Sequence, residues 1–310
     1  MALSRQVEAA DERLRDRVVE TPLVPSPHLG DGVSLKLENR QHSGSFKARG
    51  ALNRLLHLDP ETAARGVIAA STGNHALAMA WAGAQASIDD IMIFAPRSIT
   101  PAKRAKLEAK GVQVQIHGDD CMEAETEARR VAEQSGRCYV SPYNDPLVVA
   151  GQGTVGAELL RQADTLDAVL IAVGGGGLIA GTGAILKAHH PGIEIIGCLP
   201  RQSPAMLECL RAGEIIDVVS GPTLSDGTAG GVEPGAITFD WCRELVDDWI
   251  VVDEPDIAEA MEMIHAHHDM QIEGAAGVAV AAWNQAGDRW TGKRVAIVIC
   301  GGNVASPVGA

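Results

Sequence analysis

Of all residues in the sequence, Lys47 has the neighbours that most favour a reactive side chain. It follows a turn expected at Ser43, Gly44 and Ser45, and it lies near the start of a helix expected over residues 46–56. In the first turn of a helix, free backbone N–H groups and the positive end of the dipole repel an ammonium group, which lowers the pKa of the amine. A neutral lysine is a nucleophile that forms Schiff bases with carbonyl compounds. The alternative is a surface lysine that merely follows a turn, and the rest of the sequence decides between the two.

A second segment, Ala-Ser-Thr-Gly-Asn-His-Ala at residues 70–76, comes directly after an expected strand and opens a helix. Ser71 or Thr72 can cap that helix, and the N–H groups of the turn form an anion site. Asn74 adds an amide that can donate or accept a hydrogen bond. A well-capped turn without any ligand is the alternative explanation.

A third segment places four glycines, residues 174–177, between the most apolar strand and a helix expected over residues 181–189. Without side chains, the backbone N–H groups of such a loop can surround a phosphate at a helix N-terminus. No Lys-Ser/Thr pair follows, so this is not a P-loop, and Glu194 opens the next strand instead of ending it, which argues against a dinucleotide site. The loop predicts a monophosphate site, with an unliganded turn as the alternative.

Cys300 opens the fourth segment, Cys-Gly-Gly-Asn, at the end of an apolar strand expected over residues 295–299. Its side chain would lie at the C-terminal edge of the sheet, where open α/β folds bind their ligands. On its own, a buried structural cysteine explains this position equally simply.

Composition narrows the class of protein. The chain has 310 residues and a net charge of −14, which argues against a nucleic-acid partner, and aromatic residues make up only 3%. The first 20 residues lack the apolar core of a signal peptide, and no apolar run is long enough to span a membrane. Its six scattered cysteines suggest a reducing compartment. We therefore expect a cytoplasmic protein with neither a nucleic-acid nor a membrane partner.

Strand-like runs alternate with helical patterns along the chain. This alternation predicts an α/β protein with open parallel sheets that carry helices on both faces. So many strands exceed one sheet, so we expect two domains with the chemistry in the cleft between them. The expected strands are 34–37, 67–70, 91–94, 112–116, 168–173, 194–198, 249–252 and 295–299, and the expected helices, besides 46–56, are 76–84, 101–109, 122–133, 153–163, 181–189, 255–267 and 275–284.

In this order and spacing, the segments resemble the fold-type II pyridoxal-phosphate enzymes, specifically the serine/threonine dehydratase and serine racemase family. The resemblance also includes Thr21-Pro22-Leu23 and the sequences at 43–51, 150–154 and 225–229. It implies a tryptophan synthase β-like fold with a large cofactor-binding domain of residues 1–44 and 148–310. Residues 45–147 would form a small domain that binds the substrate carboxylate. A homodimer is expected.

The resemblance also implies roles for individual residues. Lys47 would form the Schiff base with pyridoxal 5′-phosphate, Asn74 would bond the phenolic oxygen of the ring, and Cys300 would face the pyridine nitrogen. The cofactor-binding set is Phe46, Lys47, Asn74, Gly174, Gly175, Gly176, Gly177, Leu178, Gly227 and Cys300, in which residues 174–178 would hold the phosphate. The α-carboxylate of a small amino-acid substrate would be bound by Ser71, Thr72, Gly73, Asn74 and His75.

The expected chemistry is β-elimination. A thiol beside the pyridine nitrogen cannot protonate it as an aspartate would, so the ring withdraws electrons less strongly. This favours immediate loss of a leaving group over transamination. Lys47, once displaced by substrate, would act as the general base, and the substrate would be L-threonine or L-serine, converted to a 2-keto acid and ammonia.

Three departures from the family pattern shape these expectations. Thr72 stands where serine racemases carry a catalytic serine, so racemisation is expected as a side activity at most. Leu199 and Ala205 replace the two carboxylates of the usual divalent-cation site, so we predict no metal there. The chain ends shortly after Cys300, which predicts a catabolic enzyme without an allosteric amino-acid-binding domain.

Several alternatives remain open at this point. One is a dehydratase for another β-hydroxy substrate, such as 3-hydroxyaspartate, phenylserine or an intermediate of hydroxyectoine breakdown. Others are a serine or aspartate racemase and a non-catalytic, nucleotide-binding regulatory protein. Substrate choice is expected to depend on Ser43, on Tyr143 and Asn144, and on residues 225–234.

Overall fold

Two β-sheets form the framework of the protein, and the computed structural model describes residues 2–304. Within this range the large sheet has the order β1-β2-β10-β7-β8-β9 and the small sheet the order β5-β4-β3-β6. Neighbouring strands are parallel except β1 and β2, which are antiparallel. The strands are β1 (Leu23–Pro25), β2 (Val33–Leu37), β3 (Val67–Ala70), β4 (Ile91–Ala95), β5 (Gln113–Ile116), β6 (Cys138–Tyr139), β7 (Ala168–Ala172), β8 (Glu194–Pro200), β9 (Asp248–Val252) and β10 (Val295–Ile299).

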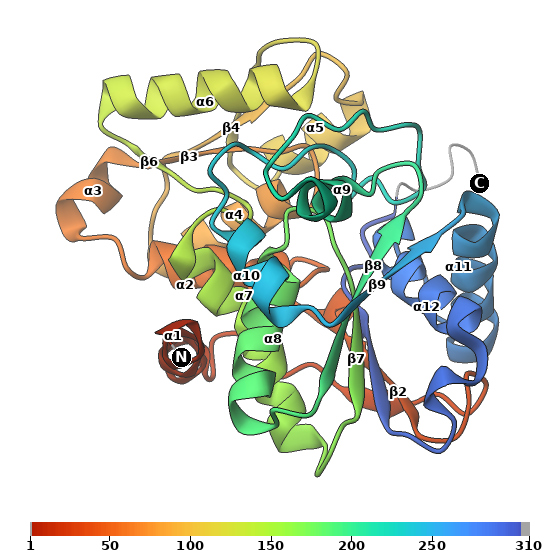
Figure 1. Ribbon diagram of the computed structural model, residues 1–310. Coiled ribbons are helices and arrows are strands. Elements are labelled where there is room, and N and C mark those ends of the chain that lie inside the picture. Colours follow the sequence, from red (N-terminus) through yellow and green to blue (C-terminus); the bar gives the residue numbers. More distant parts are fainter. Residues whose placement is uncertain (1, 305–310) are drawn as a thin grey trace.

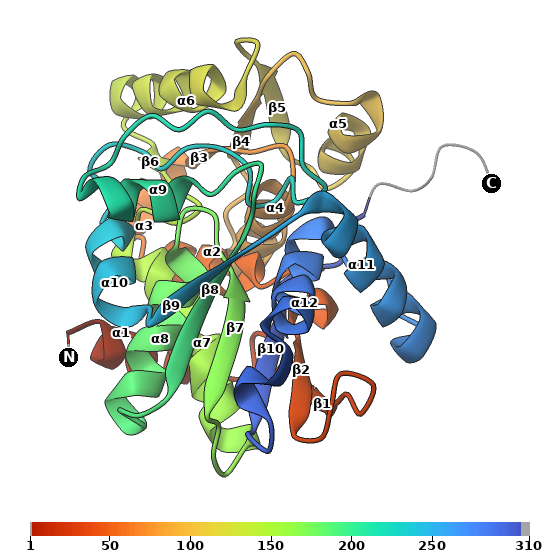
Figure 2. The same ribbon diagram turned by 45° about the vertical axis from the view of Figure 1, so that its right-hand side comes forward.

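Helices cover both faces of both sheets (Figures 1 and 2). Helices α11 and α12 lie on one face of the large sheet, and α7, α8 and α1 lie on the other; α6 and α4 cover opposite faces of the small sheet. The helices are α1 (Ala2–Leu14), α2 (Lys47–Leu55), α3 (Pro60–Arg65), α4 (Asn74–Ala86), α5 (Pro101–Glu108), α6 (Cys121–Ser135), α7 (Pro146–Gln162), α8 (Gly177–His189), α9 (Ala205–Ala212), α10 (Thr238–Leu245), α11 (Glu254–His268) and α12 (Gly274–Ala286), with short 3-10 helices η1 (Glu38–Arg40) and η2 (Gly287–Trp290).

The centre of the large sheet is buried from end to end. Every residue of β7 and β10 is buried, because helices pack on both sides of these strands. Parallel strands in this setting have continuous apolar sequences instead of alternating ones, as these two do. Their C-terminal ends lead directly into the four-glycine loop and into Cys300, so the sheet brings these two segments to the same edge.

The predicted α/β class is confirmed, and each expected strand lies within two residues of an observed one. Two helices begin a full turn or more before the predicted residue. Helix α7 begins at Pro146, because the Asp145 carboxylate accepts hydrogen bonds from the N–H groups of Leu147 and Val148. Helix α8 begins at Gly177, so the glycine loop is itself the helix N-terminus. The antiparallel edge strand β1, strand β6 and helices α1, α3, α9 and α10 were not predicted.

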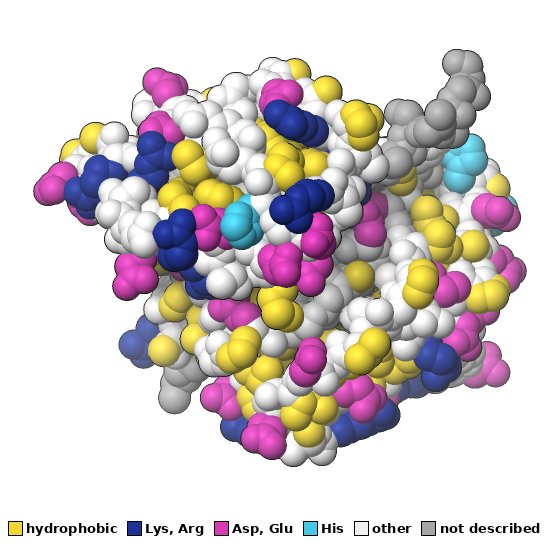
Figure 3. All heavy atoms as spheres, turned by 90° about the horizontal axis from the view of Figure 1, so that it is seen from above, with side chains coloured by type: hydrophobic (Ala, Val, Ile, Leu, Met, Phe, Trp, Pro, Cys, Tyr) yellow, Lys and Arg dark blue, Asp and Glu magenta, His cyan; other side chains and the backbone are white. Residues whose placement is uncertain are grey.

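The surface carries charges of both signs. On the face shown in Figure 3, acidic and basic side chains are interspersed among apolar and neutral groups, whereas a nucleic-acid-binding face would be mainly basic. Among the helices within residues 2–304, none combines the length and apolarity that a membrane span requires.

Candidate active site

The turn before Lys47 is joined to the segment after β10. Ser45 and Gly301 form an isolated antiparallel bridge, and the N–H group of Phe46 donates a 3.1 Å hydrogen bond to the carbonyl of Cys300. Helix α2 begins at the next residue, so Lys47 enters the helix directly beside the end of β10. The sequence-predicted lysine and cysteine are therefore brought together by backbone pairing.

The Lys47 amine is enclosed by residues from several elements. Its Nζ donates a 2.9 Å hydrogen bond to the carbonyl of Pro142 and lies 5.0 Å from the centre of the Phe46 ring. Burial lowers the pKa of this amine to about 8, although the nearby Glu273 acts in the opposite direction. The pKa is thus lowered as the sequence predicted, and the largest cause is the loss of hydration on burial.

The glycine loop is shaped by what packs against it. Gly176 precedes α8 with a φ of +84°, a left-handed conformation that favours glycine. A Cβ on Gly175 would lie 2.3 Å from Cδ1 of Tyr143, so any larger residue would collide with that ring. The loop therefore directs free N–H groups at the N-terminus of α8, which suits a phosphate. Leu178 is buried in the core behind the loop.

The turn after β3 differs in one respect from the prediction. Helix α4 begins at Asn74, and its N-cap position is taken by Gly73, which has no side chain to accept a capping hydrogen bond. Ser71 Oγ instead accepts a 3.1 Å hydrogen bond from the N–H of Gly73, so neither Ser71 nor Thr72 caps the helix. The N–H groups in the first turn of α4, beginning at Asn74, therefore receive no side-chain cap and can face an anion.

The His75 ring is held by a hydrogen bond within the protein and is not oriented to bind the substrate carboxylate. Its Nε2 is 2.9 Å from the carbonyl of Val140, so this nitrogen carries the hydrogen and donates it. Burial, together with the charge of Lys47, lowers the pKa of the imidazole to about 3. The ring is therefore neutral, and its buried Nδ1 has no hydrogen-bond partner among the described residues. An acceptor nitrogen cannot bind a carboxylate, so only the backbone of His75 suits the predicted role.

Glu273 is a functional candidate that the sequence analysis missed. Its buried carboxylate accepts hydrogen bonds of 2.9 and 2.8 Å from the Asn74 amide, and its Oε1 lies 3.7 Å from Cys300 Sγ. Burial raises the pKa of Glu273, and burial with this neighbour raises the pKa of Cys300 well above its usual value. Cys300 is therefore a neutral thiol. A lone glutamate before the small residues at the start of α12 was the available signal.

Asn303 was also missed, although it lies in the quoted Cys-Gly-Gly-Asn segment. Its amide donates 2.8 Å hydrogen bonds to Oδ1 of Asn74 and to the carbonyl of Ser43. Its own Oδ1 accepts a 3.3 Å hydrogen bond from Lys106 on α5. Asn303 thus orients Asn74 and links the large-sheet edge to the turn before Lys47. Gly227 lies nearby: a Cβ placed on this glycine would be 3.7 Å from Oε1 of Glu273.

These groups fit pyridoxal 5′-phosphate. A lysine amine of lowered pKa, a neutral thiol, an orienting amide and a helix N-terminus built from glycines converge from α2, β10, α4 and α8. Ser45 Oγ and His75 Nδ1 are buried polar atoms at the same place without hydrogen-bond partners among the described residues. An aldehyde that carries a phosphate and a heteroaromatic ring matches this set.

Leu199 and Ala205, which stand in the places of the family's cation ligands, are both buried apolar residues. Among residues 2–304 there is no group of three or more His, Cys, Asp and Glu side chains able to hold a metal ion.

Comparison with known proteins agrees with this geometry. The model of the family described as pyridoxal-phosphate dependent enzymes matches residues 14–301. The chain belongs to this family. The L-threonine ammonia-lyase of Thermotoga maritima is 39% identical over 98% of this chain and 76% of its own length. A putative threonine dehydratase of Sinorhizobium fredii is 37% identical, with 96% of this chain and 91% of that protein covered.

Solved structures give the same result for this pyridoxal-phosphate enzyme. Maize serine racemase superimposes with a TM-score of 0.91 at 31% identity and covers 97% of this chain and 94% of its own. The processed threonine deaminase isoform 2 of Solanum lycopersicum has a TM-score of 0.91 at 32% identity, with coverages of 98% and 90%. The fold-type II architecture expected from the sequence is therefore confirmed.

Proposed function

We propose that this enzyme eliminates water from a β-hydroxy amino acid such as L-threonine or L-serine and thereby produces a 2-keto acid and ammonia. The observation that supports this most strongly is the placement of the Lys47 amine next to the neutral thiol of Cys300. Relatives named as threonine ammonia-lyases and dehydratases are 34–39% identical to this chain over the aligned residues.

When bound, pyridoxal phosphate withdraws electrons from the α-carbon of an attached amino acid and so makes its α-proton acidic. Lys47 would hold the cofactor through its amine, and the glycine loop at the N-terminus of α8 would hold the phosphate. Once freed by substrate, Lys47 takes the α-proton; its pKa of about 8 leaves a useful fraction of neutral amine at neutral pH. The turn of residues 71–75 would bind the α-carboxylate through the uncapped N–H groups at the start of α4.

The neutral Cys300 determines which reaction follows. A thiol whose pKa is raised by burial and by Glu273 does not place a formal charge next to the ring nitrogen. Electrons released at the α-carbon therefore leave with the β-hydroxyl group instead of being stored. One proton and one hydroxide are lost, and the released enamine takes up one water to give the keto acid and ammonia.

The domain division is part of the proposal. Residues 1–44 and 148–310 would form the cofactor-binding domain, and residues 45–147 the smaller domain. In support, all strands of the small sheet come from residues 67–139. We further propose a cytoplasmic homodimer, with a small amino acid as the substrate.

A second candidate is elimination from a β-hydroxy amino acid with a polar or charged side chain, such as 3-hydroxyaspartate. Charged groups support it, because they join the helices near the small sheet to the segment 225–234. Lys103 Nζ lies 3.3 Å from Asp226 Oδ2, and Arg129 Nη2 lies 2.6 Å from Glu233 Oε2. A substrate side chain with charge could exchange with such pairs, whereas the methyl group of threonine could not.

The decisive experiment is release of keto acid from purified enzyme supplied with pyridoxal phosphate, over a panel of serine, threonine, 3-hydroxyaspartate and phenylserine. Lys47→Ala should abolish release from every substrate. Release from none of the panel by wild-type enzyme would refute elimination, and exchange of the α-proton without ammonia would favour a racemase.

A further inference from the structure

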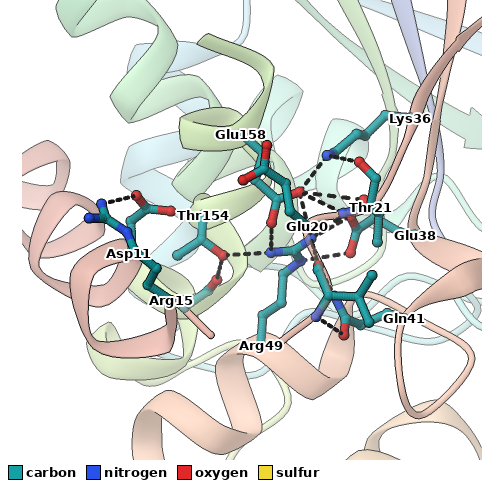
Figure 4. Close-up of polar contacts among 12 residues, drawn as sticks. Asp11, Arg15, Glu20, Thr21, Lys36, Glu38, Gln41, Arg49, Thr154 and Glu158 are labelled. Carbon is teal, nitrogen blue, oxygen red and sulfur yellow. Dashed lines mark hydrogen bonds and ion pairs between the residues drawn. The ribbon is translucent and has the colours of Figure 1, made fainter. Parts of the chain in front are cut away.

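Arg49 lies fully buried between two carboxylates, as the close-up in Figure 4 shows. Its Nε and Nη2 donate hydrogen bonds of 2.7 and 2.8 Å to the two oxygens of Glu38. Its Nη1 and Nη2 donate hydrogen bonds of 2.6 and 2.9 Å to the two oxygens of Glu158. The planar guanidinium group therefore binds both carboxylates in a bidentate manner. Lysine cannot reproduce this geometry.

The three residues come from different parts of the structure. Glu38 follows β2 in the short helix η1, and Glu158 belongs to α7, which packs against α8. Arg49 lies in the first turn of α2, two residues after Lys47. The clamp thus ties the helix that carries Lys47 to the frame that carries the glycine loop.

Lys36 completes a group of two cations and two anions. Its Nζ is paired with Glu158 and donates to the carbonyl of Thr21 at 2.6 Å and to Gln162 at 2.9 Å. Burial by itself would raise the pKa of Glu38, but Arg49 outweighs this effect and holds the pKa below its usual range. The group is charged and balanced, so displacing any member leaves an unpaired charge in the interior, which is strongly unfavourable.

Helix geometry connects this clamp to the active site. Residues two apart on a helix point about 200° apart around its axis, so Arg49 and Lys47 lie on nearly opposite sides of α2. Fixing one side therefore fixes the rotation of the helix. Because lysine is a long side chain, a small rotation would move its amine away from Pro142 and Cys300. A displacement of about 1 Å at a reacting group can cost about a hundredfold in rate.

We propose that Arg49 is a positioning residue for Lys47: its double carboxylate clamp sets the rotation and depth of α2 that bring the amine into the site. This inference rests on the proposed role of Lys47. It predicts that the loss of clamp geometry changes the properties of an amine that Arg49 does not touch.

The test uses Arg49→Lys, which keeps the positive charge but cannot grip both carboxylates. Arg54→Lys is the matched control, because Arg54 lies on the same helix but pairs with one carboxylate only, that of Asp145 at 2.7 Å, and its side chain is 20% exposed. The first readout is the pKa of Lys47 in protein freed of cofactor, obtained from the pH dependence of its acetylation by acetic anhydride and followed by mass spectrometry. The second is the division between kcat and KM on the best substrate of the panel.

For Arg49→Lys we expect the Lys47 pKa to rise from about 8 towards the ordinary value of 10.5, since a shifted helix exposes the amine. We also expect kcat to fall about ten- to a hundredfold with little change in KM. Arg54→Lys should change neither. If Arg49→Lys is insoluble, Glu158→Gln, which removes one charge at constant shape, should produce the same two changes to a smaller extent.

A folded Arg49→Lys or Glu158→Gln protein with an unchanged Lys47 pKa and unchanged kcat would overturn the proposal, even if its melting temperature were lower. The acetylation readout does not depend on the substrate. Failure of every substrate in the panel would therefore count against the proposed function, while an unchanged amine pKa would count against the role of Arg49.

Discussion

Oε1 of Glu273 lies 3.7 Å from Sγ of Cys300, in a site where the same carboxylate also accepts both of its amide hydrogen bonds from Asn74. A buried acid thus contacts the two side chains that would hold the ring of the cofactor. Burial raises the pKa of Glu273, and its negative charge raises the pKa of Lys47 against the effect of burial. Glu273 is therefore expected to adjust the basicity of the reacting amine.

Replacing this acid tests that expectation. In Glu273→Gln, the Lys47 pKa should fall below about 8, because a nearby negative charge that raises it is removed. The pH dependence of Lys47 acetylation, measured in cofactor-free protein, gives this value. Glu262→Gln on the exposed side of α11 is the control and should leave it unchanged. A higher Lys47 pKa in Glu273→Gln than in wild type would contradict this placement of Glu273.

Lys47 should make stability depend on pH. Its pKa is lower in the folded protein, so between about pH 8 and 10.5 the unfolded chain binds more protons at this residue than the folded one. Stability contributed by this residue therefore rises as the pH increases through that window. At pH 7 we expect the free energy of unfolding of Lys47→Met to exceed that of wild type by about 1–3 kcal/mol, and its melting temperature to be higher. The difference should shrink by pH 10. Thermal unfolding of both proteins at several pH values measures it, and a constant difference would refute the burial effect.

Gly175 offers a steric test of the phosphate loop. A Cβ there would lie 2.3 Å from Cδ1 of Tyr143, so Gly175→Ala must displace either the ring or the loop. We expect the affinity for pyridoxal phosphate to fall at least about tenfold, equivalent to about 1.4 kcal/mol. Gly192→Ala is the matched control, since a Cβ at Gly192 meets nothing within 4 Å. Equal cofactor affinities in the two variants would show that the loop does not depend on this close approach.

His75 should remain neutral across the working range of the enzyme. Its pKa is lowered to about 3 by burial and by Lys47, and its Nε2 hydrogen is held by the carbonyl of Val140. Imidazole ¹⁵N spectra recorded between pH 5 and pH 8 should show one tautomer, with the hydrogen on Nε2, and no titration. A midpoint inside that range would mean that the ring is not enclosed as described.

The parts of the site that the sequence could predict are those fixed by local patterns. Lys47 follows a turn, the glycines follow an apolar strand, and Cys300 ends another. Local patterns therefore marked each position as a candidate, and the order of the segments along the chain joined them into one expected site. Glu273 could not be predicted in this way, because its proposed role depends on a contact with Asn74, which lies 199 residues away in the sequence.

The fold shows the same division. Strands β7 and β10 are continuous apolar runs and were predicted closely. Helix α1 was not predicted, although Leu3, Val7, Ala10 and Leu14 recur at helical spacing and are all buried. The clamp around Arg49 lay outside any local pattern, since Glu38 and Glu158 are joined only by tertiary packing.

The central claim is that the Lys47 amine holds the cofactor. It is tested most directly by incubating the protein with pyridoxal phosphate, reducing it with borohydride to fix a pyridoxyl group on the amine that holds the cofactor, and mapping the modified peptide by mass spectrometry. We predict a single pyridoxyl group on Lys47, loss of this modification in Lys47→Ala, and no modification of the buried Lys36. A pyridoxyl group on any other lysine in its place, or none at all, would contradict this account.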